Sequence, residues 1–471
     1  MRLSQLERLQ LQLHHIMPLF REENFLVVHA GSEHTLFLFG LRDSLTPPQY
    51  KIPTVVYLDT TANEYKASNP TGTLQEIRPI KGSRIVDVPA FEALLKFILQ
   101  TIVASNPIVT INQIPLLLIV PSISYSRYAV EEITRFVFET LEFTAFNVLD
   151  LSVAAGFGVG ATSSALVVNV GHESTQIMPV ASNMALKYAG MRLEVGGKTI
   201  DEDLQKLLPH FSAQQIHALK TSPVYEVLNN HDDTFYSLTE LDENKESSAE
   251  EYEVAKIITE DTSEEEKKAE DARPNSELEK NSFVDPTTGS KIVVGKERFQ
   301  GTARLVQTIA EAIGQCLQKV PDLDKRQECY DNIIFVGSTF NIPGLRQAII
   351  LETCRQYLVL PPSTKKKSKG DQNGINSTLA SYQQADEPTE SNEATGATQV
   401  PSSIKMVKLP DYFPEWKKPK DRGGSWADAY FLGAEIYAKQ IFGANSNHGD
   451  SFIDTEIYEG RGPLAIWEVS I

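Results

Sequence analysis

Apolar residues along the chain follow two different periods, and segments of the two kinds alternate. Short unbroken apolar runs are typical of buried strands, whereas apolar residues that return every three or four positions are typical of one face of a helix. Helices are predicted over residues 89–103, 124–141, 200–208, 304–320 and 434–442. Strands are predicted at residues 54–58, 77–80, 85–88, 116–120 and 333–336, besides two hairpins. Strands interleaved with helices of this length predict an α/β fold.

The two predicted hairpins are copies of one strand–turn–strand unit. Residues 26–35 and 166–175 align without a gap at an offset of 140, and leucine, two valines, glycine, glutamate and threonine recur in register. In each copy an apolar strand enters a turn that contains a glycine, Gly31 or Gly171, and a second strand leaves it. Two hairpins of one design, one at the start of each half, predict two similar α/β domains that face each other.

Two polar segments interrupt the second half. Residues 231–282 hold 18 Asp and Glu against 6 Lys and Arg, so they carry −12 of the net charge of −18. Residues 362–402 are rich in Ser, Thr, Asn, Gln and Gly, and their lysines at 365–367 fit either a nuclear-import signal or a solvated loop. Neither segment has enough large apolar residues to offset its chain entropy on folding, so both are predicted to be disordered insertions.

Composition narrows the classes of function. The chain has 471 residues, of which 41% are hydrophobic, enough for two packed domains. Its three cysteines form no CxxC pair, which argues against structural disulfides and a zinc ribbon. No apolar run approaches the roughly 20 residues of a membrane span, and the negative charge disfavours a protein that binds a phosphate backbone. Residues 1–20 form an N-terminal extension, in which residues 1–16 predict a short amphipathic helix and no secretory signal.

Several motifs together resemble the actin family. They are the two hairpins, residues 191–197, residues 294–299, the turn at 337–344 and residues 431–435. Within the family, the run PDYFPEWKK at 410–418 is similar to an actin-related subunit of SWI/SNF- and RSC-type chromatin remodellers. The resemblance implies an actin-like, duplicated ribonuclease-H-like fold, in which two α/β domains face a nucleotide cleft. Its first half would comprise residues 21–158 and 430–471, and its second half residues 159–429.

The resemblance also implies that the cleft has lost its chemistry. In an actin-like ATPase, backbone N–H groups of the two turns bind phosphates, and an aspartate at each strand end holds hydrated Mg²⁺. His29 and Asn169 occupy these aspartate positions, and Leu151 the position of the water-orienting glutamine. Glu33 and Glu173 replace the second glycine of each turn and would repel a polyphosphate. The residues that keep the family pattern are Gly31, Ser32, Gly171, Thr175, Gly196 and Gly337. No catalytic residue, metal or nucleotide cofactor is therefore expected.

A docking groove for amphipathic helices is the other feature that the resemblance implies. It lies where the last helix of the first half meets the C-terminal segment, and its predicted walls are Phe157, Gly160, Ile436, Tyr437 and Phe442. Small residues beside Phe157 would leave room for a partner helix, although Phe157 and Tyr437 would equally suit packing of the hinge. The implied partners are the basic amphipathic helix before a remodeller's motor ATPase domain and a second actin-related protein, with nucleosomes only indirectly and no membrane. These expectations describe a nuclear, non-catalytic scaffold subunit.

Two other classes of function stay open. An actin-like ATPase with altered metal use would employ His29 or Glu33 in place of the lost aspartate, and it would bind Mg-ATP with micromolar affinity. A cytoskeletal, filament-capping actin-related protein would co-purify with dynein-linked proteins instead of a remodeller's motor subunit.

Overall fold

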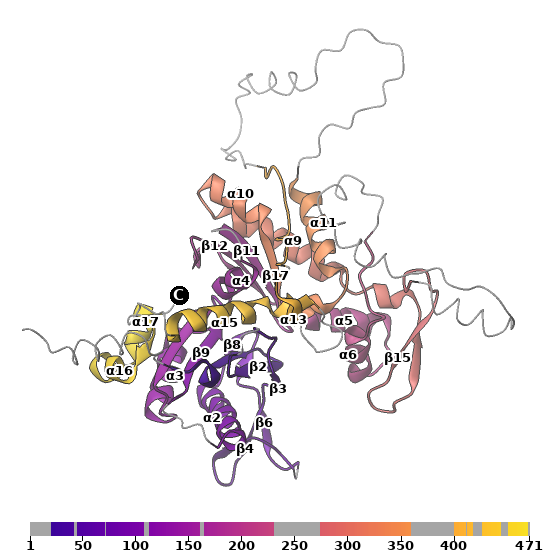
Figure 1. Ribbon diagram of the computed structural model, residues 1–471. Helices are drawn as coiled ribbons and strands as arrows, with labels where there is room; N and C mark the ends of the chain where they lie inside the picture. Colours follow the sequence, from indigo (N-terminus) through magenta and orange to yellow (C-terminus); the bar gives the residue numbers. More distant parts are fainter. Residues whose placement is uncertain are drawn as a thin grey trace, which may run out of the picture.

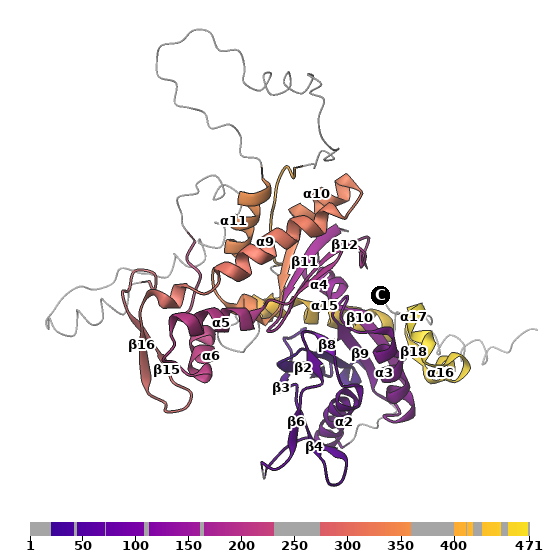
Figure 2. The same cartoon turned by 180° about the vertical axis from the view of Figure 1, so that it is seen from behind.

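The structure is a computed structural model of the 471-residue chain. It describes residues 20–41, 45–70, 72–107, 113–160, 164–229, 274–358, 400–410, 412–417, 426–443 and 451–469. The helix predicted over residues 1–16 lies outside these ranges, as do residues 231–273 and 362–399 of the two predicted insertions. Within them the chain forms two α/β halves, and the helix α15 (Ala429–Phe442) runs between the halves (Figures 1 and 2).

The first half is built on a six-stranded sheet with the order β18-β10-β9-β1-β2-β3. Strands β1, β9 and β10 are parallel, and β2, β3 and β18 pair antiparallel at its two edges. The strands are β1 (Leu26–Ala30), β2 (His34–Phe39), β3 (Tyr50–Pro53), β9 (Pro115–Val120), β10 (Ala145–Asp150) and β18 (Ile453–Asp454). Every residue of β1 and β10 is buried, because elements pack on both faces of the sheet's centre.

Helices α2 (Val88–Ser105) and α3 (Arg127–Glu139) cover one face of this sheet. Each begins at a capping side chain: Asp87 accepts the Ala90 N–H, and Ser126 accepts the Ala129 N–H. With 18 residues and a mean hydropathy of 1.4, α2 is long and apolar enough by composition to cross a membrane. Its buried side chains pack with the strands in the core of the first half, as those of a core helix do.

The second half repeats this plan around a five-stranded sheet. Its path is β13-β12-β11-β17, and β14 also pairs with β12. The strands are β11 (Ser164–Val170), β12 (Thr175–Ala181), β13 (Met184–Ala185), β14 (Met191–Leu193) and β17 (Ile333–Val336). The helices are α5 (Gly197–Leu207), α6 (Ala213–Thr221), α9 (Ala303–Gln318), α10 (Leu323–Asp331) and α11 (Leu345–Tyr357), with 3₁₀ turns η4 (Lys296–Phe299) and η5 (Ser338–Asn341).

The two hairpins have the same geometry, as their sequence repeat predicts. The last paired residues are Ala30 with Thr35 in the first and Val170 with Thr175 in the second, again at an offset of 140. In each turn the glycine N–H donates to a carbonyl three residues later, and both bonds are 3.0 Å long. The first strand of each hairpin has a parallel neighbour, β9 or β17, on its other side. The duplication is therefore structural as well as sequential.

The strands predicted between the hairpin and α2 are shorter than expected. Strands β4 (Val56–Asp59), β5 (Glu64–Lys66) and β6 (Gln75–Ile77) form a separate sheet, and β7 (Ile80–Lys81) pairs with β8 (Arg84–Ile85). The strand predicted at residues 85–88 ends at Ile85, because Asp87 caps α2 and Val88 already belongs to that helix.

Both insertions were predicted to extend further toward the C-terminus than the structure allows, because their last residues belong to the folded part of the chain. Residues 281–282, assigned to the first insertion, begin the hairpin of β15 (Asn281–Val284) and β16 (Lys291–Val294). The buried Arg298 holds residues 275–279 just before it by donating to three of their carbonyls. Residue Ser402, assigned to the second insertion, donates its N–H to Gln327 on α10. Polar side chains far along the chain thus order both ends, which composition does not reveal.

The hinge between the halves is a helix pair, α4 (Leu151–Val159) and α15. The hydrophobic core around it takes residues from both sheets, such as Val27 and Val167, so it belongs to neither half alone. The short elements α13 (Pro414–Lys417) and η6 (Trp426–Asp428) lead into α15. Trp416 is fully buried in the hinge core and donates its indole N–H to the Leu45 carbonyl at 3.1 Å.

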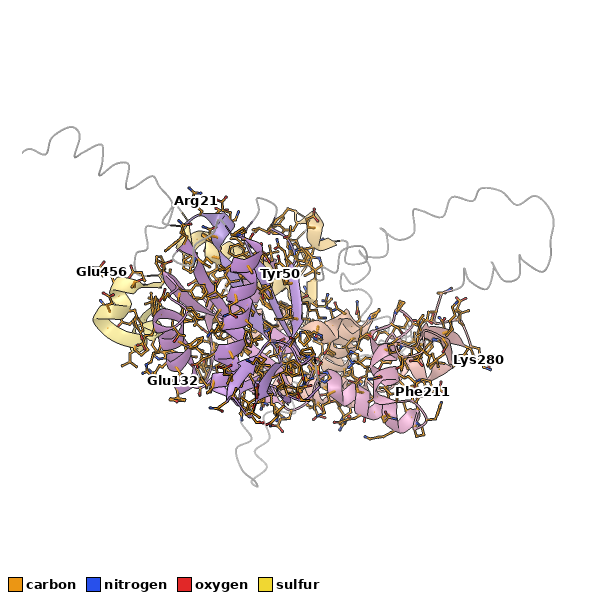
Figure 3. The ribbon with its side chains drawn as sticks, turned by 90° about the horizontal axis from the view of Figure 1, so that it is seen from below. Arg21, Tyr50, Glu132, Phe211, Lys280 and Glu456 are labelled. Carbon is orange, nitrogen blue, oxygen red and sulfur yellow. The ribbon has the colours of Figure 1, made fainter. Side chains whose placement is uncertain are left out.

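The C-terminal segment returns to the first half. It forms β18, α16 (Thr455–Arg461), η7 (Gly462–Ala465) and α17 (Ile466–Val469). The buried Asn147 on β10 fixes it by donating to the carbonyls of Ser451 at 2.7 Å and Val469 at 3.1 Å. From below (Figure 3), Glu456 on α16 lies at one end of the molecule, and Phe211 and Lys280 lie at the other.

Candidate functional site: a closed cleft and a hinge groove

The two hairpin turns face each other across the cleft between the halves. Glu33 in the first turn and His172 in the second are in contact, with 3.3 Å between Oε1 and Nε2. Glu173, also in the second turn, accepts the backbone N–H of Gly82 from the first half at 2.6 Å. The two glutamates that replace glycines therefore point at the opposite half of the molecule. The Glu33 carboxylate thus lies between the two hairpin turns, where the family resemblance locates phosphates, and the Glu173 carboxylate lies against the backbone at Gly82.

His29 is a buried core residue. It is 8% exposed, its Nδ1–H donates to the Ile119 carbonyl at 3.1 Å, and its ring meets that of Tyr430 edge-on at 4.9 Å. Burial lowers the pKa of His29 to about 4, and the hydrogen bond to Ile119 offsets only part of that effect. The imidazole is therefore neutral at neutral pH. In the described part of the chain, no three His, Cys, Asp or Glu side chains are grouped so as to hold a metal ion.

Two of the glycines that match the family pattern have structural reasons to be glycine. Gly337 has φ +106°, and a Cβ there would lie 2.4 Å from the Val170 carbonyl oxygen. A Cβ on Gly196 would lie 2.5 Å from the Gly171 carbonyl oxygen. Because they have no side chain, Gly337 and Gly196 each let their own backbone segment pack directly against the second hairpin turn. Their presence follows from backbone packing alone and needs no bound nucleotide.

The remaining predicted cleft residues lie in the first turn, at the two ends of the second turn and at the start of α4. Asn169 is half-buried on β11, and Ser32 is half-buried in the first turn. Thr175 is buried and donates its hydroxyl to the Val195 carbonyl at 2.7 Å. Leu151 is 1% exposed and packs in the hinge core. None of these side chains presents a carboxylate to the cleft.

Sequence reasoning missed Asp150, the residue before Leu151. It is 2% exposed, accepts the hydroxyl of Ser122 at 2.6 Å and caps α4 by accepting the Ser152 N–H at 2.8 Å. Burial raises the pKa of Asp150, while these hydrogen bonds act against the rise. An aspartate at the junction of an apolar strand and a helix is a recognisable cap signal, and it was available in the sequence.

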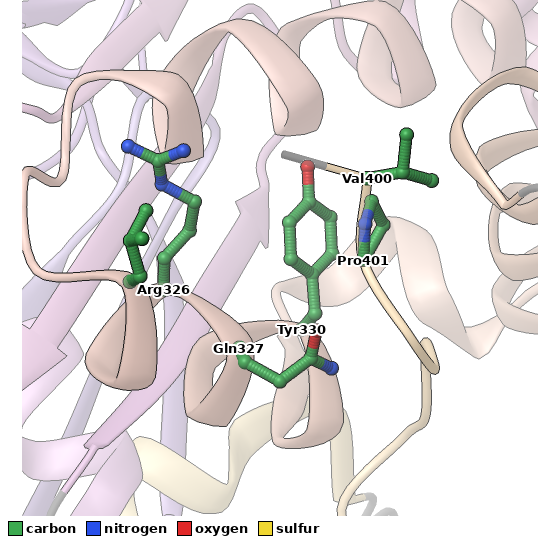
Figure 4. Close-up of a pocket in the computed structure, with 6 residues that line it drawn as sticks. Arg326, Gln327, Tyr330, Val400 and Pro401 are labelled. Carbon is green, nitrogen blue, oxygen red and sulfur yellow. The ribbon is translucent and has the colours of Figure 1, made fainter. Parts of the chain in front are cut away.

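A cavity of about 1030 Å³ opens beside the closed turns. Its lining comes from both halves, and most of the lining residues have polar side chains, among them Glu33, Arg78, His172, Asp201 and His217. Asp201 is already engaged, since one of its oxygens accepts Lys220 Nζ at 2.6 Å. A second depression, too shallow to enclose a water molecule, lies between α10 and residues 400–401 (Figure 4). It lies at the outer end of the second half, and half-exposed Leu323 and Val400 form part of its rim, so we assign no site to it.

The predicted groove residues divide between surface and core. The rings of Phe157 and Tyr437 stack with centroids 5.9 Å apart, but Tyr437 is only 4% exposed. Phe442 is fully buried among the rings of Phe20, Phe25 and Phe452, so it supports the hinge from inside and is not a surface wall. Phe157 and Ile436 are half-buried, and Gly160 is exposed. The surface available to a partner is therefore made by these three residues and their neighbours.

The room that small residues leave beside Phe157 is partly taken by the chain itself. A Cβ on Gly158 would lie 2.0 Å from the Ala429 carbonyl oxygen, so this glycine lets α15 cross α4 at close range. Gly156, in contrast, has no atom within 4 Å of its Cβ position. The expectation that the small residues beside Phe157 leave room for a partner helix is therefore wrong for Gly158, because α15 already occupies that side of α4.

Two further exposed side chains extend the groove surface. Met184 is 61% exposed on β13, a strand that packs against α4. Tyr412 is 68% exposed, and its hydroxyl lies 3.1 Å from the Cβ position of Gly160. Tyr412 belongs to the distinctive run 410–418, whose Trp416 is anchored in the hinge core. We define the groove surface as Phe157, Gly160, Met184, Tyr412 and Ile436.

The duplicated halves, the matched hairpin turns and the hinge helices define an actin-like protein. A family model described as Actin matches residues 22–369, about three quarters of the chain, and the chain belongs to the actin family. Over 96% of its length it is 24% identical to the "SWI/SNF and RSC complexes subunit arp9" of Schizosaccharomyces pombe, 99% of which is covered. It is also 24% identical, over 73% of its length, to 88% of "Actin-related protein 7" of Arabidopsis thaliana. These comparisons confirm the resemblance that the sequence motifs predict.

Proposed function

We propose that this protein is a non-catalytic, actin-related scaffold subunit of a nuclear, ATP-dependent chromatin-remodelling complex. The observation that carries the proposal is the closed cleft, in which Glu33 and Glu173 each contact the opposite half of the molecule. Similarity over 96% of the chain to a relative named as a SWI/SNF and RSC complexes subunit supports the choice of complex. The protein then acts through its surfaces, because side chains take the place of a phosphate ligand.

The docking surface in this proposal is the groove surface at the hinge. Its partner is the basic amphipathic helix that precedes the motor ATPase domain, with a second actin-related protein bound alongside. Aromatic and aliphatic side chains that are half-exposed on a rigid helix pair are suitable anchors for the apolar face of such a helix. The net charge of −18 favours encounter with a basic segment, chiefly through the association rate.

Capture of the wild-type protein by a synthetic peptide of the pre-ATPase helix tests this proposal. Ile436→Asp, at a half-buried groove position, is expected to lower the affinity about tenfold or more, because a charge replaces an apolar anchor. Tyr437→Asp is less suitable, since Tyr437 is 4% exposed and its replacement would disturb the core. The matched control is Leu207→Asp on α5, where the leucine is 43% exposed. Equal affinity of a folded Ile436→Asp variant and the wild type would contradict the assignment of the groove.

Co-purification tests the complex. Recovery of a remodeller's motor subunit with a second actin-related protein is expected, whereas recovery of dynein-linked proteins would favour the filament-capping alternative. Micromolar affinity for Mg-ATP, measured by calorimetry on the purified protein, would favour the ATPase alternative.

A further inference from the structure

The turn between β7 and β8 reaches from the first half to the second hairpin turn. Gly82 lies at the tip of this turn, and both its backbone N–H and its backbone carbonyl form hydrogen bonds across the cleft. Its N–H donates to Glu173 Oε2 at 2.6 Å, and its carbonyl accepts Nε and Nη2 of Arg192 at 2.9 and 2.7 Å. A backbone amide and carbonyl of one half are thus held by two oppositely charged side chains of the other. Hydrogen bonds to charged groups are the stronger kind in proteins.

The next residue adds a further contact between the halves. Ser83 Oγ lies 2.6 Å from Ser174 Oγ, and Ser174 is 2% exposed. Deeper in the cleft, Gln176 of the second half donates to Ser124 of the first, and both side chains are buried. Because Ser174, Gln176 and Ser124 are buried, these contacts face less competition from solvent than surface hydrogen bonds do.

The local backbone is shaped for this contact. Gly82 and Ser83 both have positive φ, +53° and +63°, which gives the tight turn between two strands of two residues each. A Cβ on Gly82 would lie 2.4 Å from Arg192 Nη2, so glycine leaves the guanidinium room at the carbonyl. Arg192 itself lies on β14, with its side chain 11% exposed. The partner group is therefore positioned by the sheet of the second half.

We propose that Gly82, Ser83, Glu173, Ser174 and Arg192 form a latch that keeps the cleft closed in the absence of any nucleotide. The α4–α15 pair is the pivot, and none of the five latch residues lies on either of these helices. The relative orientation of the two halves is then set by the chain's own contacts and stays the same whether or not nucleotide is present. The latch does not depend on the docking partner proposed above, so each can fail without the other.

A cysteine pair tests whether the halves stay closed in solution. Two serine oxygens 2.6 Å apart stand close to the roughly 2 Å separation of disulfide sulfurs. The variant Ser83→Cys/Ser174→Cys is expected to form an intramolecular disulfide under mild oxidation without nucleotide, at a rate that Mg-ATP leaves unchanged. The three native cysteines are buried and do not compete. No disulfide in a folded double variant, or a disulfide that forms only with Mg-ATP, would overturn the proposal.

Hydrogen exchange supplies a second measurement on proteins without added cysteines. Glu173→Ala and Arg192→Ala are each expected to speed exchange of the amides at residues 80–86 about tenfold, since each removes a charged partner of Gly82. The strands of the hinge core should keep their protection. The matched control is Arg135→Ala, which breaks an exposed ion pair with Glu132 inside the first half. Unchanged exchange at residues 80–86 in both folded variants would show that these residues do not hold the cleft.

Discussion

Burial decides what His29 does in this molecule. The side chain stands at a position where the family resemblance implies a metal-holding aspartate, yet it is 8% exposed and bonded to the Ile119 carbonyl. Its pKa of about 4 lies below the usual 6.5, because the charged form would be poorly solvated. The imidazole thus contributes packing and one hydrogen bond.

Acid should destabilise the protein through His29. Between pH 6.5 and 4 the unfolded chain binds a proton that the folded chain does not, so the free energy of unfolding falls by about 3 kcal/mol as the pH drops through this window. His29→Asn keeps a donor for Ile119 and removes the titration, so the variant should lose less stability over the window. Urea unfolding at pH 7, 5.5 and 4.5 checks the difference. Asp428, whose pKa burial raises to about 6, acts in the opposite direction in both proteins. Equal pH slopes would contradict this account.

Arg298 shows how one side chain orders a segment that composition predicts to be disordered. It is fully buried and donates to the carbonyls of Asn275, Leu278 and Gly295 at 2.6–2.7 Å. Its planar guanidinium also lies over Phe299, with Cζ 4.1 Å from the centroid of the phenyl ring. The fork geometry lets one group serve several carbonyls of a chain that lacks regular structure there.

Arg298→Met should cost about 3 kcal/mol of unfolding free energy, because the carbonyls that it serves lose their donor inside the protein. Chemical denaturation measures this loss, and proteolysis near residues 274–280 should become faster. Lys296→Met, an exposed position in the same 3₁₀ turn, is the control and should stay within about 0.5 kcal/mol of the wild type. A loss of similar size in both variants would argue against the role of Arg298.

At the scale of elements, the close crossing of α4 and α15 determines the hinge. Gly158 and Gly433 face each other there, and a Cβ on Gly433 would lie 1.8 Å from the Ala154 carbonyl oxygen. Backbone contact of this kind leaves no space for side chains and gives the two helices one fixed crossing. The groove surface keeps its shape for the same reason, since Phe157 and Ile436 lie on these two helices.

Gly158→Ala should destabilise the protein by about 3 kcal/mol or more, because the methyl group would be forced against the Ala429 carbonyl. Gly156→Ala, two residues earlier, meets no atom within 4 Å and should be neutral or more stable by about 0.5–1 kcal/mol, as expected in a helix interior. The midpoints of thermal unfolding measure both. Similar midpoints for the two variants would mean that the helices can move apart at little cost.

For the whole molecule, the closed cleft predicts indifference to nucleotide. A ligand present at 100 times its Kd stabilises a folded protein by about 2.7 kcal/mol, which shifts the melting temperature by several degrees. Millimolar Mg-ATP is expected to leave the melting temperature of this protein unchanged, whereas actin under the same conditions serves as the positive control. A clear upward shift would support the ATPase alternative.

Local sequence patterns predicted the long elements well and the short ones poorly. The helices expected over residues 89–103 and 304–320 correspond to α2 and α9, because a strong apolar period is a local property. Residues 85–88 were predicted to form a strand, but Asp87 caps α2 and Val88 is its first residue. Strands β15 and β16, which lie inside or beside a polar segment, were not predicted. Short strands depend on partners elsewhere, so periodicity alone does not locate them.

By itself the sequence determined the duplicated hairpins, the actin family and the absence of aspartate at residues 29 and 169. These follow from residue identity and from patterns within a few positions. Only the tertiary structure decided that Glu33 meets His172, that Glu173 holds Gly82, and that Phe442 is buried. The physical reason is that the cleft contacts join residues far apart in the chain, 91 positions for Gly82 and Glu173, and they form only when both halves have folded and packed around the hinge.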